Sequence, residues 1–208
     1  MDKFTALTSI AAPLLENAID TDIIFPARFL LLLDRDGLGK YAFNEWRGPG
    51  FVLDTPPYDT AQILVTGENF GTGSSREQAV WTLADKGIRC VIARSFGEIF
   101  YSNCFKNGVL PVRLTGADMD AVEAAAKAEV PVTVNLESKT VSLSDGTSIP
   151  FDVADHHRRN LLAGLDEVGM ILTDHSDAIE SFEARRSEAT PWLNLPQAKL
   201  DALAKDGA

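Results

Sequence analysis

The chain has 208 residues, which is enough for one domain with a substantial core and at most a small appendage. Its hydrophobic content of 45% and charged content of 24% are ordinary for a soluble globular protein. The net charge of −11 opposes general binding to nucleic acid or to anionic membranes, because both depend on a positive surface. An anionic ligand would therefore need a local basic site within an acidic protein.

Targeting signals and cysteines indicate the cellular location and the cofactors that this chain could hold. The N-terminal segment has no basic stretch followed by a long apolar core, so it does not resemble a signal peptide. The apolar run at residues 29–33 is far shorter than the about 20 residues that span a bilayer. We therefore expect a cytoplasmic protein with no membrane contact. Cys90 and Cys104 are the two cysteines of the sequence, too few for a disulfide framework or a complete cysteine-held iron–sulfur site.

The apolar patterns predict alternating strands and helices along the chain. Helices are expected where apolar residues recur at helical spacing, and strands where they alternate or form short runs. Within the strand-rich region near residue 140, Asp145–Gly146 marks a tight turn. The predicted strands are 3–11, 63–65, 88–93, 109–112, 132–136, 140–143 and 148–151, and the predicted helices are 79–84, 96–103, 119–129 and 177–186.

The stretch Gly67–Trp81 is the one around which we expect the chain to be organised. It follows the apolar run 63–65 and leads into a helical pattern, so the local order is strand, glycine loop, helix. Gly71 and Gly73 allow positive φ and close approach of the backbone to another group.

The end of this loop predicts an anion site. Ser74 or Ser75 suits the N-cap of the following helix, whose first N–H groups are unpaired and carry partial positive charge. Arg76 adds a planar fork of donors for a carboxylate or phosphate. A Walker-type phosphate loop would need a lysine after the last glycine, and a nucleophile elbow would need a glycine two residues after the serine; neither is present.

A dinucleotide site is the alternative that spacing leaves open. Gly71 and Gly73 follow a strand, and a second apolar run at residues 90–93 ends in Arg94 and Ser95, where a 2′-phosphate would fit. The third glycine of that fingerprint is replaced by Arg76. A non-catalytic anion- or dinucleotide-binding module therefore stays open beside an enzyme.

Several motifs in the same order resemble one known family. The segment from Asn69 to Ala79 resembles the Gly-Ser-Ser-Arg-Glu segment of the aconitase superfamily. Further stretches are similar to the small subunits of 3-isopropylmalate dehydratase, and the match extends to about Arg186: they are Ala18–Phe29, Ser95–Gly108 and Leu161–Asp166.

The resemblance implies a fold and a domain division. The fold is α/β, similar to the swivelling domain of aconitases, with a small mixed, barrel-like sheet flanked by helices in β/β/α layers. Residues 1–186 would form this domain. Residues 187–208 would be a C-terminal tail that is either mobile or packed on a partner.

The resemblance also implies a reaction and a partner. The chain would be the small subunit of a hydro-lyase that isomerises 2-isopropylmalate and 3-isopropylmalate by dehydration and rehydration in leucine biosynthesis. It would be active only with a large subunit, which holds a [4Fe–4S] cluster, and this chain alone would bind no cofactor or metal. A small hydroxy diacid would be the substrate.

The family's site residues carry over to matching positions here. Ser74 matches the serine that serves as base for the carbon-bound proton, and Thr21 with Asp22 matches a Thr-Asp pair at the active site. The implied catalytic residues are Ser74, Asp22 and Arg76, and the implied substrate-binding residues are Thr21, Arg35, Gly73, Ser75 and Arg76.

This sequence departs from the usual family pattern near the implied site. The departures are Phe25, Tyr41, Thr72 and Gln78, where isoleucine, a nearby histidine, cysteine and histidine are common. Asp34 and Asp36 also flank Arg35, and carboxylates near a dianionic substrate oppose its binding unless they pair or point away. The same chemistry on another hydroxy diacid, such as a methylmalate or a dimethylmalate, is therefore the alternative substrate.

Overall fold

The computed structural model describes residues 1–32, 34–73, 76–193 and 199. The chain divides into two compact units, residues 1–166 and residues 167–208. Among the residues described, no helix is both long enough and apolar enough to cross a membrane.

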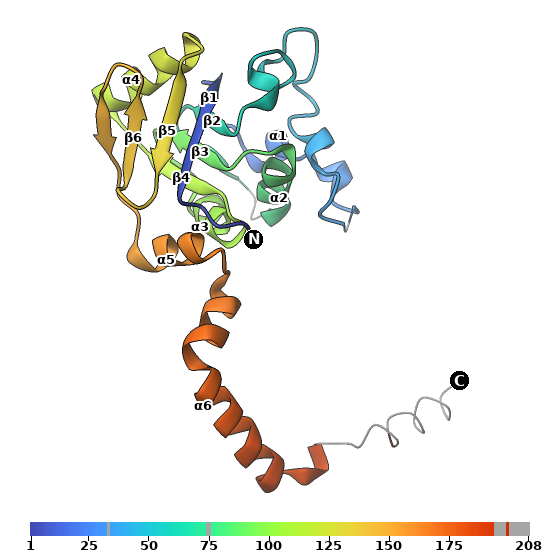
Figure 1. Cartoon of the computed structure of the whole chain (residues 1–208). Coiled ribbons are helices and arrows are strands. Elements are labelled where there is room, and N and C mark those ends of the chain that lie inside the picture. The colour runs from blue at the N-terminus through green and yellow to red at the C-terminus, as the bar shows by residue number, and fades with distance from the viewer. Residues whose placement is uncertain (33, 74–75, 194–198, 200–208) are drawn as a thin grey trace. The chain divides into compact units, whose positions relative to one another are not determined.

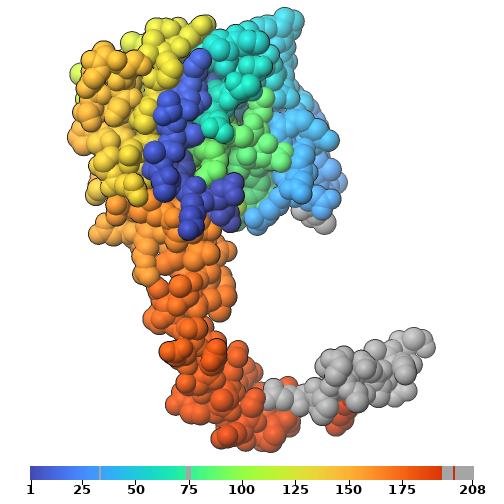
Figure 2. Space-filling model, in the orientation of Figure 1, coloured from blue at the N-terminus to red at the C-terminus, as the bar shows by residue number. Residues whose placement is uncertain are grey.

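The first unit is built on one mixed sheet of seven strands in the order β4-β3-β2-β1-β5-β6-β7 (Figure 1). Strands β1 to β4 pair in parallel, whereas β5, β6 and β7 continue the sheet from β1 in antiparallel pairs. In Figure 2 the N-terminal segment, in dark blue, runs between the yellow and orange strands and the cyan and green segments. The strands are β1 (Ala6–Leu14), β2 (Ile63–Thr66), β3 (Cys90–Ala93), β4 (Leu110–Arg113), β5 (Pro131–Asn135), β6 (Thr140–Leu143) and β7 (Ser148–Pro150).

The parallel half of the sheet is covered on both faces. Every residue of β2 and β3 is buried, which explains why these strands are continuous apolar runs rather than alternating patterns. Leu64 and Val91 point into one apolar core, and their neighbours Ile63 and Ile92 point into the other.

Helices on the two faces complete these cores. Helix α2 contributes Val80 and Leu83 to the first core, and α4 contributes Met119 and Val122 to the second. Helix α3 contributes to both cores. The helices of the first unit are α1 (Thr21–Ile24), α2 (Glu77–Lys86), α3 (Glu98–Lys106), α4 (Gly116–Lys127) and α5 (Asp155–Ala163), and single 3₁₀ turns lie at Ala27–Phe29, Gly39–Tyr41, Val52–Asp54 and Tyr58–Thr60.

The second unit contains the long helix α6 (Glu167–Ala189) and a 3₁₀ turn at Pro191–Leu193. His175, with φ −129° and ψ 18°, interrupts α6, so two helical segments meet at this residue. The predicted helix at residues 177–186 lies within the segment that follows His175, whereas the segment that begins at Glu167 was not predicted. Val168, Ile171 and Leu172 are separated from the later apolar residues by a charged and polar stretch, and this hid the helical period.

The predicted α/β fold with a mixed sheet and flanking helices is confirmed. Helix α2 begins at Glu77 rather than at residue 79, and α3 begins at Glu98 rather than at residue 96. Boundaries shift in this way because they depend on capping contacts that apolar spacing does not encode.

Candidate functional site

The glycine loop leaves the carboxyl end of β2 and is held by backbone hydrogen bonds. The N–H of Gly71 donates to the carbonyl of Ile19 at 2.7 Å, and the N–H of Phe70 donates to the carbonyl of Ser95 at 3.0 Å. Gly71 has φ +71°, and a Cβ at this position would lie 2.1 Å from Cγ of Phe100. Only glycine therefore fits where the loop crosses α3.

The segment that precedes α1 lies beside this loop. The N–H of Thr21 donates to the carbonyl of Thr72 at 3.0 Å, and Asp20 and Thr72 form a parallel bridge. Gly73, at φ +89°, has space for a Cβ 3.5 Å from Cβ of Asp20. Two segments about 50 positions apart in sequence therefore form one backbone cradle, with Thr21 buried in it.

The two aspartates of this segment have different roles. Asp20 is the N-cap of α1, since its Oδ1 accepts from the N–H of Ile23 at 2.8 Å. Asp22 instead forms an ion pair with Nη1 of Arg76. The Arg76 side chain is 18% exposed and that of Asp22 is 51% exposed. The pair uses one of the five N–H donors of the guanidinium, so several remain for an anion.

Helix α2 begins directly after Arg76. Arg76 itself is the N-cap, and its side chain makes no capping hydrogen bond. The prediction that Ser74 or Ser75 caps this helix is therefore wrong at the position of the cap. Ser74 and Ser75 lie outside the described residues. The first N–H groups of α2 and the guanidinium of Arg76 are the donors that this side of the site offers to an anion, while Glu77 of the same turn accepts from Nδ2 of Asn107 at 2.8 Å.

Arg35 is not in the cradle with Thr21, Asp22, Gly73 and Arg76. Its guanidinium carbon lies 4.2 Å from the ring centroid of Trp81, on the side of α2. A pocket of about 200 Å³ opens beside this stack, and its lining residues are Arg35, Asp36, Trp81, Ala84, Asp85 and Asn107. Sequence analysis did not identify Trp81, Asp85 or Asn107, because nothing local in the sequence indicates contacts with a loop more than 40 residues away.

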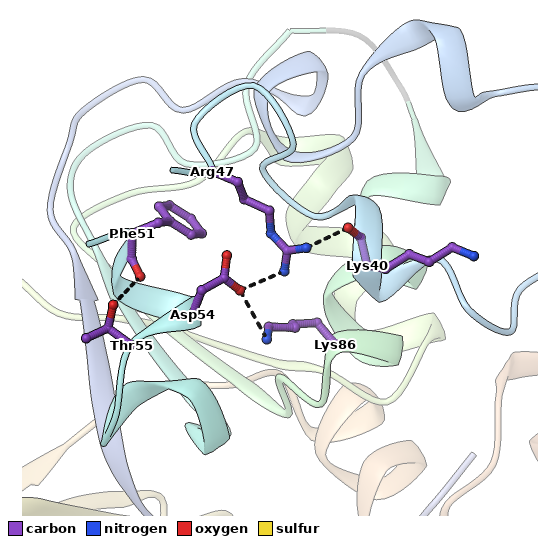
Figure 3. A network of polar contacts seen from close by, with 6 residues as sticks. All are labelled: Lys40, Arg47, Phe51, Asp54, Thr55 and Lys86. Atoms are coloured by element: carbon purple, nitrogen blue, oxygen red, sulfur yellow. Dashed lines mark hydrogen bonds and ion pairs between the residues drawn. The ribbon is translucent and has the colours of Figure 1, made fainter. Parts of the chain in front are cut away.

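A polar network fixes the far end of the loop that carries Arg35 (Figure 3). Nη1 of Arg47 donates to the carbonyl of Lys40 at 2.6 Å, and its Nη2 donates to Oδ1 of Asp54 at 3.0 Å. Nζ of Lys86, the last residue of α2, lies 3.9 Å from the same Asp54 oxygen. The network therefore ties residue 40 to the C-terminal end of α2.

The residues suggested for a dinucleotide phosphate are already engaged. Nη2 of Arg94 lies 2.7 Å from Asp120 and 2.6 Å from Glu123, and these carboxylates raise the pKa of the guanidinium. Oγ of Ser95 accepts from the N–H of Asn69 at 2.7 Å. The geometry therefore does not favour a 2′-phosphate at this edge.

The cysteines of this chain are unsuited to holding a metal cluster. Burial raises the pKa of both thiols, and the neighbouring Cys90 raises the pKa of the Cys104 thiol further. A cluster ligand must be a thiolate, which these surroundings disfavour. Within the described part of the chain, no group of three or more His, Cys, Asp or Glu side chains could hold a metal ion. Both cysteines are fully buried among apolar residues.

The departures from the family pattern are accommodated by backbone contacts and packing. Thr72 contributes its carbonyl to the N–H of Thr21, a contact independent of its side chain. Phe25 is fully buried, and Tyr41 stacks on Phe29 with centroids 4.3 Å apart. The carbonyl of Gln78 accepts from Oγ1 of Thr82 within α2.

Comparison with known families identifies the class of protein to which the mixed sheet and the glycine loop belong. Residues 1–117 match the aconitase C-terminal domain family. Residues 119–155 match the family described as LeuD_N, and residues 174–195 match the family described as the C-terminal domain of the 3-isopropylmalate dehydratase small subunit.

Individual relatives narrow the class to one family. The chain is 50% identical over 201 residues to the 3-isopropylmalate dehydratase small subunit of Brucella anthropi, a match that covers 92% of this chain and 100% of that protein. It is 51% identical over 202 residues to that of Dinoroseobacter shibae, covering 93% and 100%. The crystal structure of 3-isopropylmalate dehydratase from Methanocaldococcus jannaschii matches with a TM-score of 0.64 and 25% identity, over 86% of this chain and 99% of that one. The chain belongs to the family of 3-isopropylmalate dehydratase small subunits.

Proposed function

We propose that this chain is the small subunit of a hydro-lyase that interconverts 2-isopropylmalate and 3-isopropylmalate in leucine biosynthesis. The observation that carries the proposal is the ion pair of Arg76 with Asp22 beside the buried Thr21, at the start of α2. Family membership supports the reaction, because relatives about half identical over nearly the whole chain are named 3-isopropylmalate dehydratase small subunits.

In the proposed site, Arg76 and the N–H groups of the first turn of α2 bind a substrate carboxylate. Asp22 orients the guanidinium by occupying one of its donors. Thr21 and Gly73 form the floor of the site, and Ser75 supplies a second hydroxyl. Arg35 binds the other end of the diacid.

Ser74 is proposed as the base that accepts the carbon-bound proton. A serine hydroxyl is too weak an acid to ionise unaided at neutral pH, so its surroundings must stabilise the alkoxide. A helix N-terminus contributes about 0.3–2 kcal/mol, and a charge-assisted hydrogen bond contributes about 1.5–3 kcal/mol. These contributions are a small part of what is needed, so exclusion of water by a partner subunit supplies the remainder.

We assign the [4Fe–4S] cluster to that large subunit. The buried protonated thiols of this chain do not fit a cluster. When bound, such a cluster supplies a Lewis-acid centre for the substrate hydroxyl and carboxylate. The small subunit would supply the base and the carboxylate contacts.

The test is turnover by this chain reconstituted anaerobically with the large subunit of the same organism. We expect isomerisation of isopropylmalate by the pair and none by either chain alone. Ser74→Ala should abolish turnover while leaving assembly intact, as size-exclusion chromatography would show. Ser138→Ala, in the hairpin between β5 and β6, is the matched control and should keep wild-type turnover. Turnover by this chain alone, or by the Ser74→Ala pair at the wild-type rate, would refute the assignment.

The alternative substrate is a smaller hydroxy diacid, such as a methylmalate or dimethylmalate. The reason to test it is that Asp34 and Asp36 on either side of Arg35 depart from the usual family pattern at the proposed substrate contact. A panel of hydroxy diacids assayed beside isopropylmalate separates the two. A higher kcat/KM for a smaller diacid would change the assigned substrate and leave the reaction class unchanged.

A further inference from the structure

The loop that carries Arg35 is fitted against α2 at two points. At one, the Arg35 guanidinium lies on the Trp81 ring, 4.2 Å from its centroid. At the other, the N–H of Gly39 donates to Oδ2 of Asp85 at 2.6 Å. The loop approaches so closely here that a Cβ on Gly39 would lie 2.5 Å from the backbone N of Lys86. Helix α2 is therefore the surface on which this loop is placed.

Stacking leaves the binding edge of Arg35 available. A guanidinium that lies over an aromatic ring typically stacks by its planar face, which leaves the N–H groups at its edge free to bind an anion. Among the described residues, Arg35 makes no ion pair, although Asp34 and Asp36 are its neighbours in sequence. Asp85, which lines the same pocket, is engaged by Gly39.

Helix α2 carries the other cation of the site as well. Arg76 is its N-cap, and Trp81 follows five residues later, which corresponds to about 7.5 Å along the helix axis. A rigid helix thus sets the position of Arg76 directly and that of Arg35 through the Trp81 ring. A diacid has two carboxylates to place, and the spacing of two cations selects among diacids.

We propose that Trp81 is a positioning residue for substrate recognition: its ring holds Arg35 beside the pocket with the guanidinium edge free for one carboxylate of the diacid. Trp81 acts through Arg35 and does not touch the reacting atoms. The inference rests on the proposed function, in which Arg35 binds the end of the substrate remote from Arg76.

Removing the ring should weaken binding without slowing the chemical step. In the reconstituted complex, Trp81→Leu should raise KM about two- to fivefold, the range that an exposed cation–π contact corresponds to, with kcat changed less than twofold. Trp81→Phe keeps an aromatic face and should keep KM within about twofold of the wild type. It also keeps most of the packing, so it remains informative if Trp81→Leu does not fold.

A double-mutant cycle separates positioning from general packing. Arg35→Gln should raise KM more than Trp81→Leu does, and adding Trp81→Leu to Arg35→Gln should then change KM by less than about 1.5-fold. The matched control is Arg89→Gln. Arg89 also lies over a ring, that of Phe4 at 5.7 Å, but it precedes β3, at the edge of the sheet opposite the glycine loop, and its loss should leave KM unchanged.

The assay uses whichever hydroxy diacid the wild-type complex converts, so a different substrate leaves this test intact. Absence of turnover by the wild-type complex on every diacid would refute the proposed function itself. With an active wild type, an unchanged or lower KM in Trp81→Leu, equal KM values in Trp81→Leu and Trp81→Phe, or an undiminished effect of Trp81→Leu in the Arg35→Gln background would each overturn the positioning role.

Discussion

The two loops that carry the proposed site are held in different ways. The glycine loop is fixed by backbone hydrogen bonds to Ile19, Thr21 and Ser95, at the carboxyl ends of the fully buried strands β2 and β3. The loop around Arg35 is fixed mainly by side chains: the Trp81 ring, the Asp85 carboxylate and the Arg47 guanidinium. Backbone contacts tolerate changes of side chain, whereas side-chain contacts do not.

This difference suggests a division of roles between the loops. Thr72 differs from the family's usual residue, yet its carbonyl makes the same kind of contact that any residue would make there. The residues on either side of Arg35 are aspartates, and a few side chains support the loop that carries them. We therefore expect the glycine loop to determine the reaction and the Arg35 loop to determine the preferred diacid.

The largest expected effect is on the first loop. Arg76→Gln removes the charge that pairs with Asp22 and that we propose binds the substrate carboxylate. We expect kcat/KM of the reconstituted complex to fall about 10²–10³-fold, as for loss of one transition-state donor. Arg76→Lys keeps the charge without the planar fork, so its kcat/KM should lie between those of the wild type and Arg76→Gln. A wild-type kcat/KM in Arg76→Gln would show that Arg76 does not bind the substrate.

The support of the two loops is compared directly by two glycine substitutions. Gly71→Ala places a Cβ 2.1 Å from Phe100 at φ +71°, so it should lower the free energy of unfolding by about 2–4 kcal/mol. Gly37→Ala, at φ +79° with nothing within 4 Å, should cost only the backbone strain of about 1–2 kcal/mol. Urea unfolding of the full chain measures both. Equal losses would mean that the glycine loop has no tighter packing than the Arg35 loop.

The sequence predicted the first loop better than the second, for a physical reason. Strand, glycine loop and helix are consecutive in sequence, so local spacing indicates Gly71, Gly73 and Arg76 together. Asp22 was predicted as a site residue only through the family resemblance, because its partner Arg76 is 54 positions away in sequence. Contacts such as Gly39 with Asp85, 46 positions apart, depend on tertiary packing and leave no local pattern.

Alkaline pH should lower the free energy of unfolding through the two buried cysteines, Cys90 and Cys104. Burial raises the pKa of Cys90 and Cys104 in the folded chain, whereas in the unfolded chain each thiol ionises near pH 8.5. Below about pH 8.5 the thiols are protonated in both states, so stability is fully present there. Above it the unfolded chain loses protons that the folded chain keeps, and stability falls by about 1.4 kcal/mol per pH unit for each thiol.

The measurement is the free energy of unfolding between about pH 8 and 9.5, below the range where lysines titrate. Cys104→Ala is the matched variant, and its slope above about pH 8.5 should be about half that of the wild type. Equal slopes in the two proteins would show that Cys104 does not contribute to the pH dependence.

The smallest expected effect concerns the charge beside Arg35. Asp36 lines the pocket next to Trp81, and its carboxylate opposes a dianionic substrate there. Asp36→Asn should lower KM about twofold at low ionic strength, and the difference should shrink as salt shortens the Debye length to about 10 Å at 0.1 M. Asp34→Asn removes the same charge from a residue that lines the neighbouring pocket, with Leu31 and Gly37, and not the pocket beside Trp81, so it should have a smaller effect. If both variants shifted KM equally, the acidic residues would act through net charge, and the position of Asp36 would have no special influence on which diacid is bound.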